Sequence, residues 1–142
     1  MNAAVRLRIS QVLIGLVVFF NLQSAIGLIA APQEYAPGFE LEGIMGEGII
    51  RGIGLLFIMW NVPYMVALIN PARYRISLYE SVVMQSIALV GEILLLQTIP
   101  MIHTTIHASV NRFILFDGAG WVALMLTVWL SRGSGLSQHV NE

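Results

Sequence analysis

The chain has 142 residues, of which 57% are hydrophobic and 11% are charged, with a formal net charge of −1 and no cysteine. Globular proteins average about 25% charged and about 45–50% apolar residues, so this composition indicates a membrane protein, and the length leaves room for a single domain. The sequence has no basic patch with interleaved aromatic residues, which argues against a nucleic-acid partner. The absence of cysteine excludes disulfides and cysteine metal sites.

The first apolar run extends from about residue 9 to residue 31 and follows a basic start with Arg6 and Arg8. A membrane-spanning helix needs about 20 apolar residues, so this run predicts the first span. A basic start and an apolar run also describe a signal peptide, and Ala25-Ile26-Gly27 is compatible with a cleavage site. The length of the run favours the spanning helix over the signal peptide.

The second span is predicted from about Glu47 to Ile69, after a loop (31–46) rich in proline, glycine and glutamate. A helical period of 3.6 residues places five of its residues on one narrow face: Glu47, Arg51, Gly54, Ile58 and Asn61. Lipid is a poor neighbour for charged and amide side chains, so we expect this face to contact protein or a wet cavity. Gly48 and Gly52 form a G-x-x-x-G pair, which lets two helices approach closely.

The third span is predicted at about 76–99 and the fourth at about 108–130, followed by a polar tail, 131–142. Ser81, Gln85 and Glu92 fall within one face of the third span. Short connections join the four runs, so the sequence predicts an all-α integral membrane bundle of four transmembrane helices, up-down-up-down, that forms one domain over 1–142.

The arginines indicate the orientation of the bundle. Those outside the spans fall on one side of the predicted membrane: Arg6, Arg8, Arg73, Arg75 and Arg132. Positive charge in short loops marks the cytoplasmic side, so we expect both termini to be cytoplasmic.

Five charged residues are expected in the outer half of the bundle: Glu47, Arg51, Glu92, Arg112 and Asp117. A lone charge inside the membrane costs on the order of 2.5–3.5 kcal/mol or more, which favours pairing between them. One interpretation is a structural ion-pair network, supported by a polar stripe of Asn61, Ser81 and Gln85. The other is an outward-opening polar pocket that binds an anion, a head group or a quinone carbonyl, or relays protons.

His103 and His107 are spaced i, i+4 and would share a face if their segment is helical. Such a pair can ligate a metal, but the sequence lacks the glutamate of an H-E-x-x-H site and offers no obvious third ligand nearby. We therefore predict no metal site and retain the two histidines as the only candidate ligands.

Three short motifs resemble the layout of the small four-helix DoxX-like and DUF4345-type membrane proteins. They are Arg51-Gly52-Ile53-Gly54, Pro71-Ala72-Arg73 and 112–118, which begins with Arg and ends with Asp-Gly. The resemblance covers residues 45–130 by layout and only these motifs by residue. It implies a bundle of the bacterial inner membrane with Arg51, Arg112 and Asp117 as polar positions. DoxX is associated with a quinone-linked oxidoreductase, whereas the DUF4345 type has no assigned activity.

Two functions follow from these patterns. The first is a small non-enzymatic membrane protein, either an accessory subunit or a homo-oligomeric scaffold held by the buried ion-pair network. The alternative is a quinone-linked redox or lipid- and small-ligand-binding component that uses the same polar residues as its pocket. The expected partners are membrane lipids, other membrane subunits or a second copy of the chain. The cofactor is unknown: a quinone and a lipid are the candidates, and no specific motif implies either.

Overall fold

The computed structural model describes residues 2–132 as four long helices and a short helical connection, with no strand within that range. The long helices are α1 (Ala3–Ala30), α3 (Gly43–Ile69), α4 (Arg75–Thr98) and α5 (Thr104–Arg132). Between α1 and α3 lie α2 (Pro32–Tyr35) and the 3-10 helix η1 (Ala36–Phe39). Each long helix is long and apolar enough to cross a membrane. The predicted all-α four-helix bundle is confirmed.

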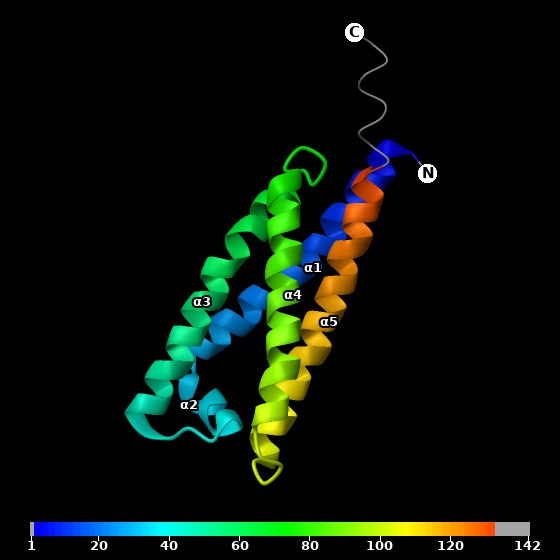
Figure 1. The fold of residues 1–142 in the computed structure, drawn as a ribbon. Coiled ribbons are helices and arrows are strands. Elements are labelled where there is room, and N and C mark those ends of the chain that lie inside the picture. The colour runs from blue at the N-terminus through cyan, green and yellow to red at the C-terminus, as the bar shows by residue number, and fades with distance from the viewer. Residues whose placement is uncertain (1, 133–142) are drawn as a thin grey trace.

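The four long helices form a closed ring in which each packs against the next in the chain and α5 packs back against α1. Figure 1 shows α1 running obliquely behind α4, its start beside the end of α5. The start of α1, the turn at 70–74 and the end of α5 lie together, and we call this the terminal end. The opposite loop end carries α2, η1 and the turn at 99–103.

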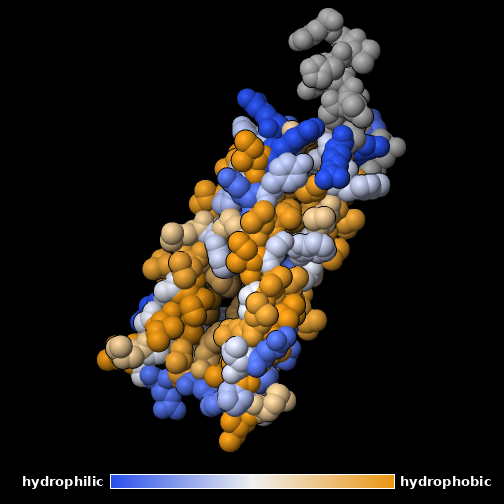
Figure 2. Space-filling view, viewed as in Figure 1, coloured by the Kyte–Doolittle hydropathy of each residue, from blue (hydrophilic) through white to orange (hydrophobic). Residues whose placement is uncertain are grey.

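The outer surface of the bundle is apolar. Figure 2 shows hydrophobic side chains over the sides of the molecule and hydrophilic ones gathered at its two ends. Large exposed hydrophobic residues occur on every long helix, for example Leu16, Leu56, Val83 and Leu126. A water-soluble bundle would bury such side chains, whereas lipid accommodates them, and helices satisfy their own backbone groups there. The protein is therefore an integral membrane protein, while its orientation and the bacterial inner membrane stay predictions.

A glycine allows α1 and α3 to approach closely. A Cβ added at Gly54 would lie 2.7 Å from Ile29 Cγ1 and 2.9 Å from the backbone oxygen of Ala25. Gly48 and Gly52, in contrast, have no atom within 4 Å of such a Cβ. The close approach within the chain therefore occurs at Gly54, and the G-x-x-x-G pair faces outward.

Several element boundaries differ from the predicted ones. Helix α1 begins at Ala3, where the Asn2 side chain accepts a hydrogen bond from the Ala4 N–H at 3.3 Å and caps the helix. The loop predicted at 31–46 contains α2 and η1, and the residue that follows η1, Glu40, adopts a left-handed φ of 55°. Ser131 and Arg132, expected in the polar tail, belong to α5, and the rest of that tail (133–142) lies outside the described residues.

Candidate functional site

The structure places the five charged residues of the predicted network in three separate groups. Arg51 Nη2 lies 3.3 Å from Glu47 Oε2, one helical turn away, with side chains that are 49% and 32% exposed. An exposed pair of this kind contributes about 0.3–0.5 kcal/mol. Within residues 2–132, no ion pair joins Arg51 or Arg112 to either of the other two acids. The two arginines therefore do not compensate those acids in this structure.

Arg112 forms the second group, at the loop end. Its Nη2 donates to Ser109 Oγ at 3.0 Å, and the Ser109 hydroxyl donates to the backbone oxygen of Gly38 at 2.7 Å. This chain of hydrogen bonds fixes α5 against η1. The other donors of the Arg112 guanidinium form no hydrogen bond within the described part of the chain and are available to a ligand.

Arg112 lines a cavity of about 500 Å³, which we call the loop-end pocket. Half of its lining residues are aromatic and most of the others are polar; the wall consists of Ser24, Glu34, Tyr35, Gly38, Phe39, Phe57, Ser109, Arg112, Phe113 and Phe116. The Phe113 ring centroid lies 6.0 Å from that of Phe39 and 6.2 Å from that of Phe57. Binding sites for small molecules have this size and composition, since aromatic walls hold the ligand and a few polar groups orient it.

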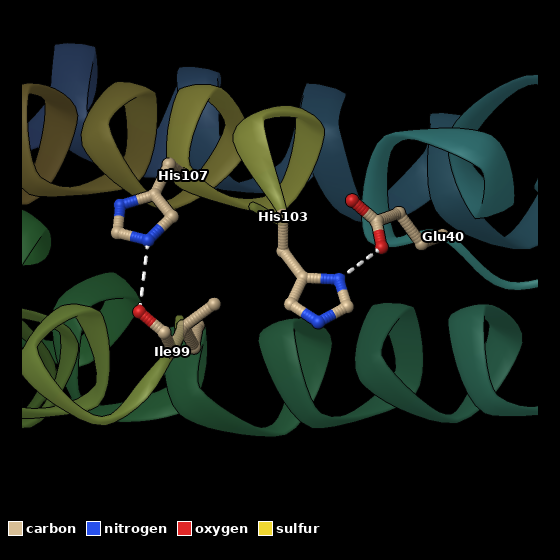
Figure 3. A network of polar contacts seen from close by, with 4 residues as sticks. All are labelled: Glu40, Ile99, His103 and His107. Carbon is tan, nitrogen blue, oxygen red and sulfur yellow. Dashed lines mark hydrogen bonds and ion pairs between the residues drawn. The ribbon is translucent and has the colours of Figure 1, made fainter. Parts of the chain in front are cut away.

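The cover of this pocket is α2 with η1, and two contacts hold it in place in addition to the hydrogen bond from Ser109 to Gly38. Tyr35 packs over Gly27 so closely that an added Cβ there would lie inside contact distance of the Tyr35 ring. His103 Nδ1 lies 2.6 Å from Glu40 Oε2, which joins the turn at 99–103 to the end of η1 (Figure 3). Helices as short as α2 and η1 are not stable by themselves, so the position of this segment over the pocket depends on these contacts.

The two histidines have separate partners. His103 contacts Glu40, while His107 Nε2 lies 3.0 Å from the backbone oxygen of Ile99 (Figure 3). Within the part of the chain that the structure describes, no group of three or more His, Cys, Asp or Glu side chains is arranged to hold a metal ion. The role supported by these contacts is to fasten the two loops of this end.

Glu92 and Asp117 form the third group, deeper in the bundle. Their carboxyl groups lie within hydrogen-bonding reach of each other, and Glu92 Oε2 is buried without a hydrogen-bond partner among residues 2–132. Two ionised carboxylates offer only acceptor atoms, so this contact becomes a hydrogen bond only when one of them carries a proton. The pair can therefore hold a proton inside the membrane.

A buried polar chain continues from Asp117 toward the middle of the bundle. Gln85 Nε2 donates to Asp117 Oδ1 at 2.8 Å, and the Tyr64 hydroxyl donates to Gln85 Oε1 at 2.7 Å. The same hydroxyl lies 3.1 Å from the backbone oxygen of Ser81. Asn61, Ser81 and Gln85, the predicted polar stripe, are all buried, so the structure does bring these three to one region.

Asn61 borders a small cavity beside this chain. Its Nδ2 donates to the backbone oxygen of Phe57 at 2.7 Å, but its Oδ1 is buried without a partner within residues 2–132. The cavity measures about 20 Å³ and also contacts Tyr64 and Gln85. This is room for one water molecule, which would satisfy the Asn61 oxygen. Phe57 lines both this cavity and the loop-end pocket.

The sequence interpretation missed the aromatic residues of the site. Phe39, Phe57 and Phe113 come from three elements, and only the tertiary fold brings them together. Tyr64, which the predicted polar stripe does not include, is buried and bonded to Gln85. Its position three residues after Asn61, on the same helical face, was the available signal for burial.

Comparisons with known proteins provide no relative from which the role of this site could be inferred. No protein-family model matches the chain, and searches of curated proteins and of solved structures find no match. The resemblance to DoxX-like and DUF4345-type proteins therefore stays a prediction.

Proposed function

We propose that the protein is a non-enzymatic integral membrane protein that binds a lipid-soluble ligand in the loop-end pocket. The observation that carries this proposal is the placement of Arg112, with free donors, in an aromatic pocket of about 500 Å³. The polar side chains there are a guanidinium, one acid and three hydroxyls, of which the Ser109 hydroxyl already donates to Gly38. Polar side chains of these kinds can bind a ligand and orient it in the pocket.

The chemistry of the wall defines the class of ligand. The guanidinium is a planar donor that favours carbonyl, carboxylate or phosphate oxygens, so the ligand carries an oxygen acceptor at its head. The rings of Phe39, Phe57 and Phe113 favour an aromatic or isoprenoid body. A quinone and a lipid with a compact polar head both meet these requirements, in line with the quinone link that the DoxX resemblance implies.

Arg112→Gln is expected to lower ligand retention by about 10- to 100-fold, because a hydrogen bond to a charged group contributes about 1.5–3 kcal/mol. Glutamine keeps a donor for Ser109, so the contact to η1 is preserved. The measurement is mass spectrometry of an organic-solvent extract of the full chain, purified in mild detergent from membranes. The matched control is Arg51→Gln, which removes an exposed arginine that does not line the pocket.

Wild type and Arg51→Gln are expected to carry the same discrete compound near one molecule per chain. Equal amounts in Arg112→Gln, with helicity unchanged by circular dichroism, would show that Arg112 does not hold a ligand. A wild-type extract that contains only bulk membrane lipid in proportions of the surrounding bilayer would also count against the proposal.

A second candidate is the accessory subunit or homo-oligomer, favoured by the outward position of Gly48 and Gly52 on α3. Among residues 2–132, nothing outside the local helix packs within 4 Å of a Cβ at either glycine, so this G-x-x-x-G pair is free to contact another helix. Gly48→Leu/Gly52→Leu is expected to shift an oligomer to monomers in light scattering in mild detergent. Gly91→Leu, at an equally open glycine of α4, serves as control. A wild type that is monomeric at all concentrations and copurifies with no other subunit would exclude this candidate.

A further inference from the structure

The terminal end contains a second large cavity, remote from the loop-end pocket. It measures about 670 Å³ and lies between the start of α1, the turn at 70–74 and the end of α5. We call it the arginine pocket, because its polar wall includes Arg6, Arg73 and Arg75 together with Ser10, Asn70 and Ser131. No aspartate or glutamate of the described chain lines it. Two segments distant in sequence, the start of α1 and residues 73–75, thus bring three positive charges to one concave site, and the end of α5 completes its wall.

These arginines have no acidic partner within residues 2–132, where both ion pairs lie elsewhere. Arg6 Nε is buried and has no hydrogen-bond partner in that range, whereas Arg75 Nε donates to the backbone oxygen of Ala72 at 3.2 Å. The Arg73 guanidinium lies 5.6 Å from the centroid of the Tyr74 ring, which orients it without using its donors. A buried donor without a partner and like charges held close together are unfavourable alone, so a bound anion would stabilise this site.

The fold holds the pocket in a fixed shape. The Asn70 side-chain oxygen accepts hydrogen bonds from the backbone N–H groups of Ala72 at 3.1 Å and Arg73 at 3.0 Å, which fixes the turn. Gln11 Nε2 donates to the backbone oxygen of Ile69 at 2.9 Å and ties α1 to the end of α3. An anion would therefore meet donors that are already in place, and little ordering is needed on binding.

The structure assigns to this pocket the binding of the phosphate group of an anionic phospholipid. Arginine is suited to phosphate because its planar fork presents two parallel donors to two oxygens. Basic pockets between helices at the membrane surface hold acidic head groups in this way. The pocket lies at the hydrophilic end of an apolar bundle (Figure 2), so a lipid can place its head among the arginines and its chains along the helices. A free phosphate offers the same oxygens and is the competing source.

The test uses the full chain in a non-ionic detergent, with native mass spectrometry to count bound lipid during titration with phosphatidylglycerol. Arg6→Gln and Arg73→Gln are each expected to weaken binding by roughly fivefold or more, the effect of removing one arginine near an anionic head group. Arg8→Gln, which removes an exposed arginine of the same end that does not line the pocket, is expected to bind as wild type. Phosphatidylcholine, whose choline neutralises the phosphate, is expected to bind weakly.

Inorganic phosphate separates the two sources of the anion. Displacement of phosphatidylglycerol only by another anionic lipid supports the lipid head group, and displacement by millimolar phosphate assigns the pocket to the free anion and overturns the lipid assignment. Equal weakening by Arg8→Gln, or equal binding of phosphatidylcholine, would contradict a specific site, because lipid binding would then not depend on the arginines of this pocket. Arg73 is itself exposed, so its variant keeps the test valid if Arg6→Gln fails to fold.

Discussion

Gly54→Ala is expected to destabilise the bundle by about 1–3 kcal/mol, the usual cost of overpacking a well-packed contact. The added Cβ would lie 2.9 Å from the backbone oxygen of Ala25 and 2.7 Å from Ile29 Cγ1. A backbone oxygen within a helix cannot move aside as the tip of a side chain can, so α1 and α3 must separate. The measurement is the free energy of unfolding of the full chain in mixed detergent micelles.

Gly52→Ala is the matched control, two residues earlier in the same helix. Nothing lies within 4 Å of its Cβ, and alanine is a better helix former than glycine, so stability should stay equal or rise slightly. If Gly52→Ala costs as much as Gly54→Ala, the loss reflects any change in this helix and the contact between α1 and α3 is not at Gly54.

Glu92→Gln is expected to stabilise the protein by about 1.5–3 kcal/mol, although it removes the native side chain. Glutamine has nearly the same shape, removes one of two adjacent acids and donates a hydrogen bond to the Asp117 carboxylate. Hydrogen bonds to charged groups contribute about that amount. The gain should appear as a higher midpoint of thermal unfolding near neutral pH. Such a gain would mark the acid pair as retained for a purpose other than stability.

The control for this variant is Glu80→Gln, on the same helix. Glu80 is exposed and has no ion pair or hydrogen bond through its side chain in the described chain, so its replacement should change stability by less than about 0.5 kcal/mol. An unchanged or lower midpoint for Glu92→Gln would show that the Glu92 carboxylate has a stabilising cation or water that the present contacts do not include.

Hydropathy and length were enough to predict the four spans, because a bilayer imposes a fixed thickness on every apolar run. The period of α4 also placed Ser81 and Gln85 correctly in the interior. Helix α3 shows where this reasoning ends. Gly54 and Asn61 are buried as expected, but Arg51 is exposed. The buried face of α3 is centred closer to Ile50 and Tyr64 than the polar pattern predicted, and Arg51 lies outside it.

The loop-end pocket was beyond prediction from the sequence for a related reason. Its wall combines residues of η1, α3 and α5, and their distances depend on how α2 and η1 fold over the bundle. The sequence marks 31–46 only as a segment of prolines, glycines and acids. The contact between His103 and Glu40, across 63 positions, has no periodic signature, so the fastening of the two loops was not visible either.

The central claim is that the loop-end pocket holds a lipid-soluble ligand, and an experimental structure of the full chain in lipid nanodiscs, purified without added ligand, tests it most directly. The account predicts non-protein density in the pocket, with an oxygen about 2.7–3.2 Å from the Arg112 guanidinium and an apolar body between Phe39 and Phe113. A pocket filled only by water, or closed by an ion pair between Arg112 and Glu34, would contradict it.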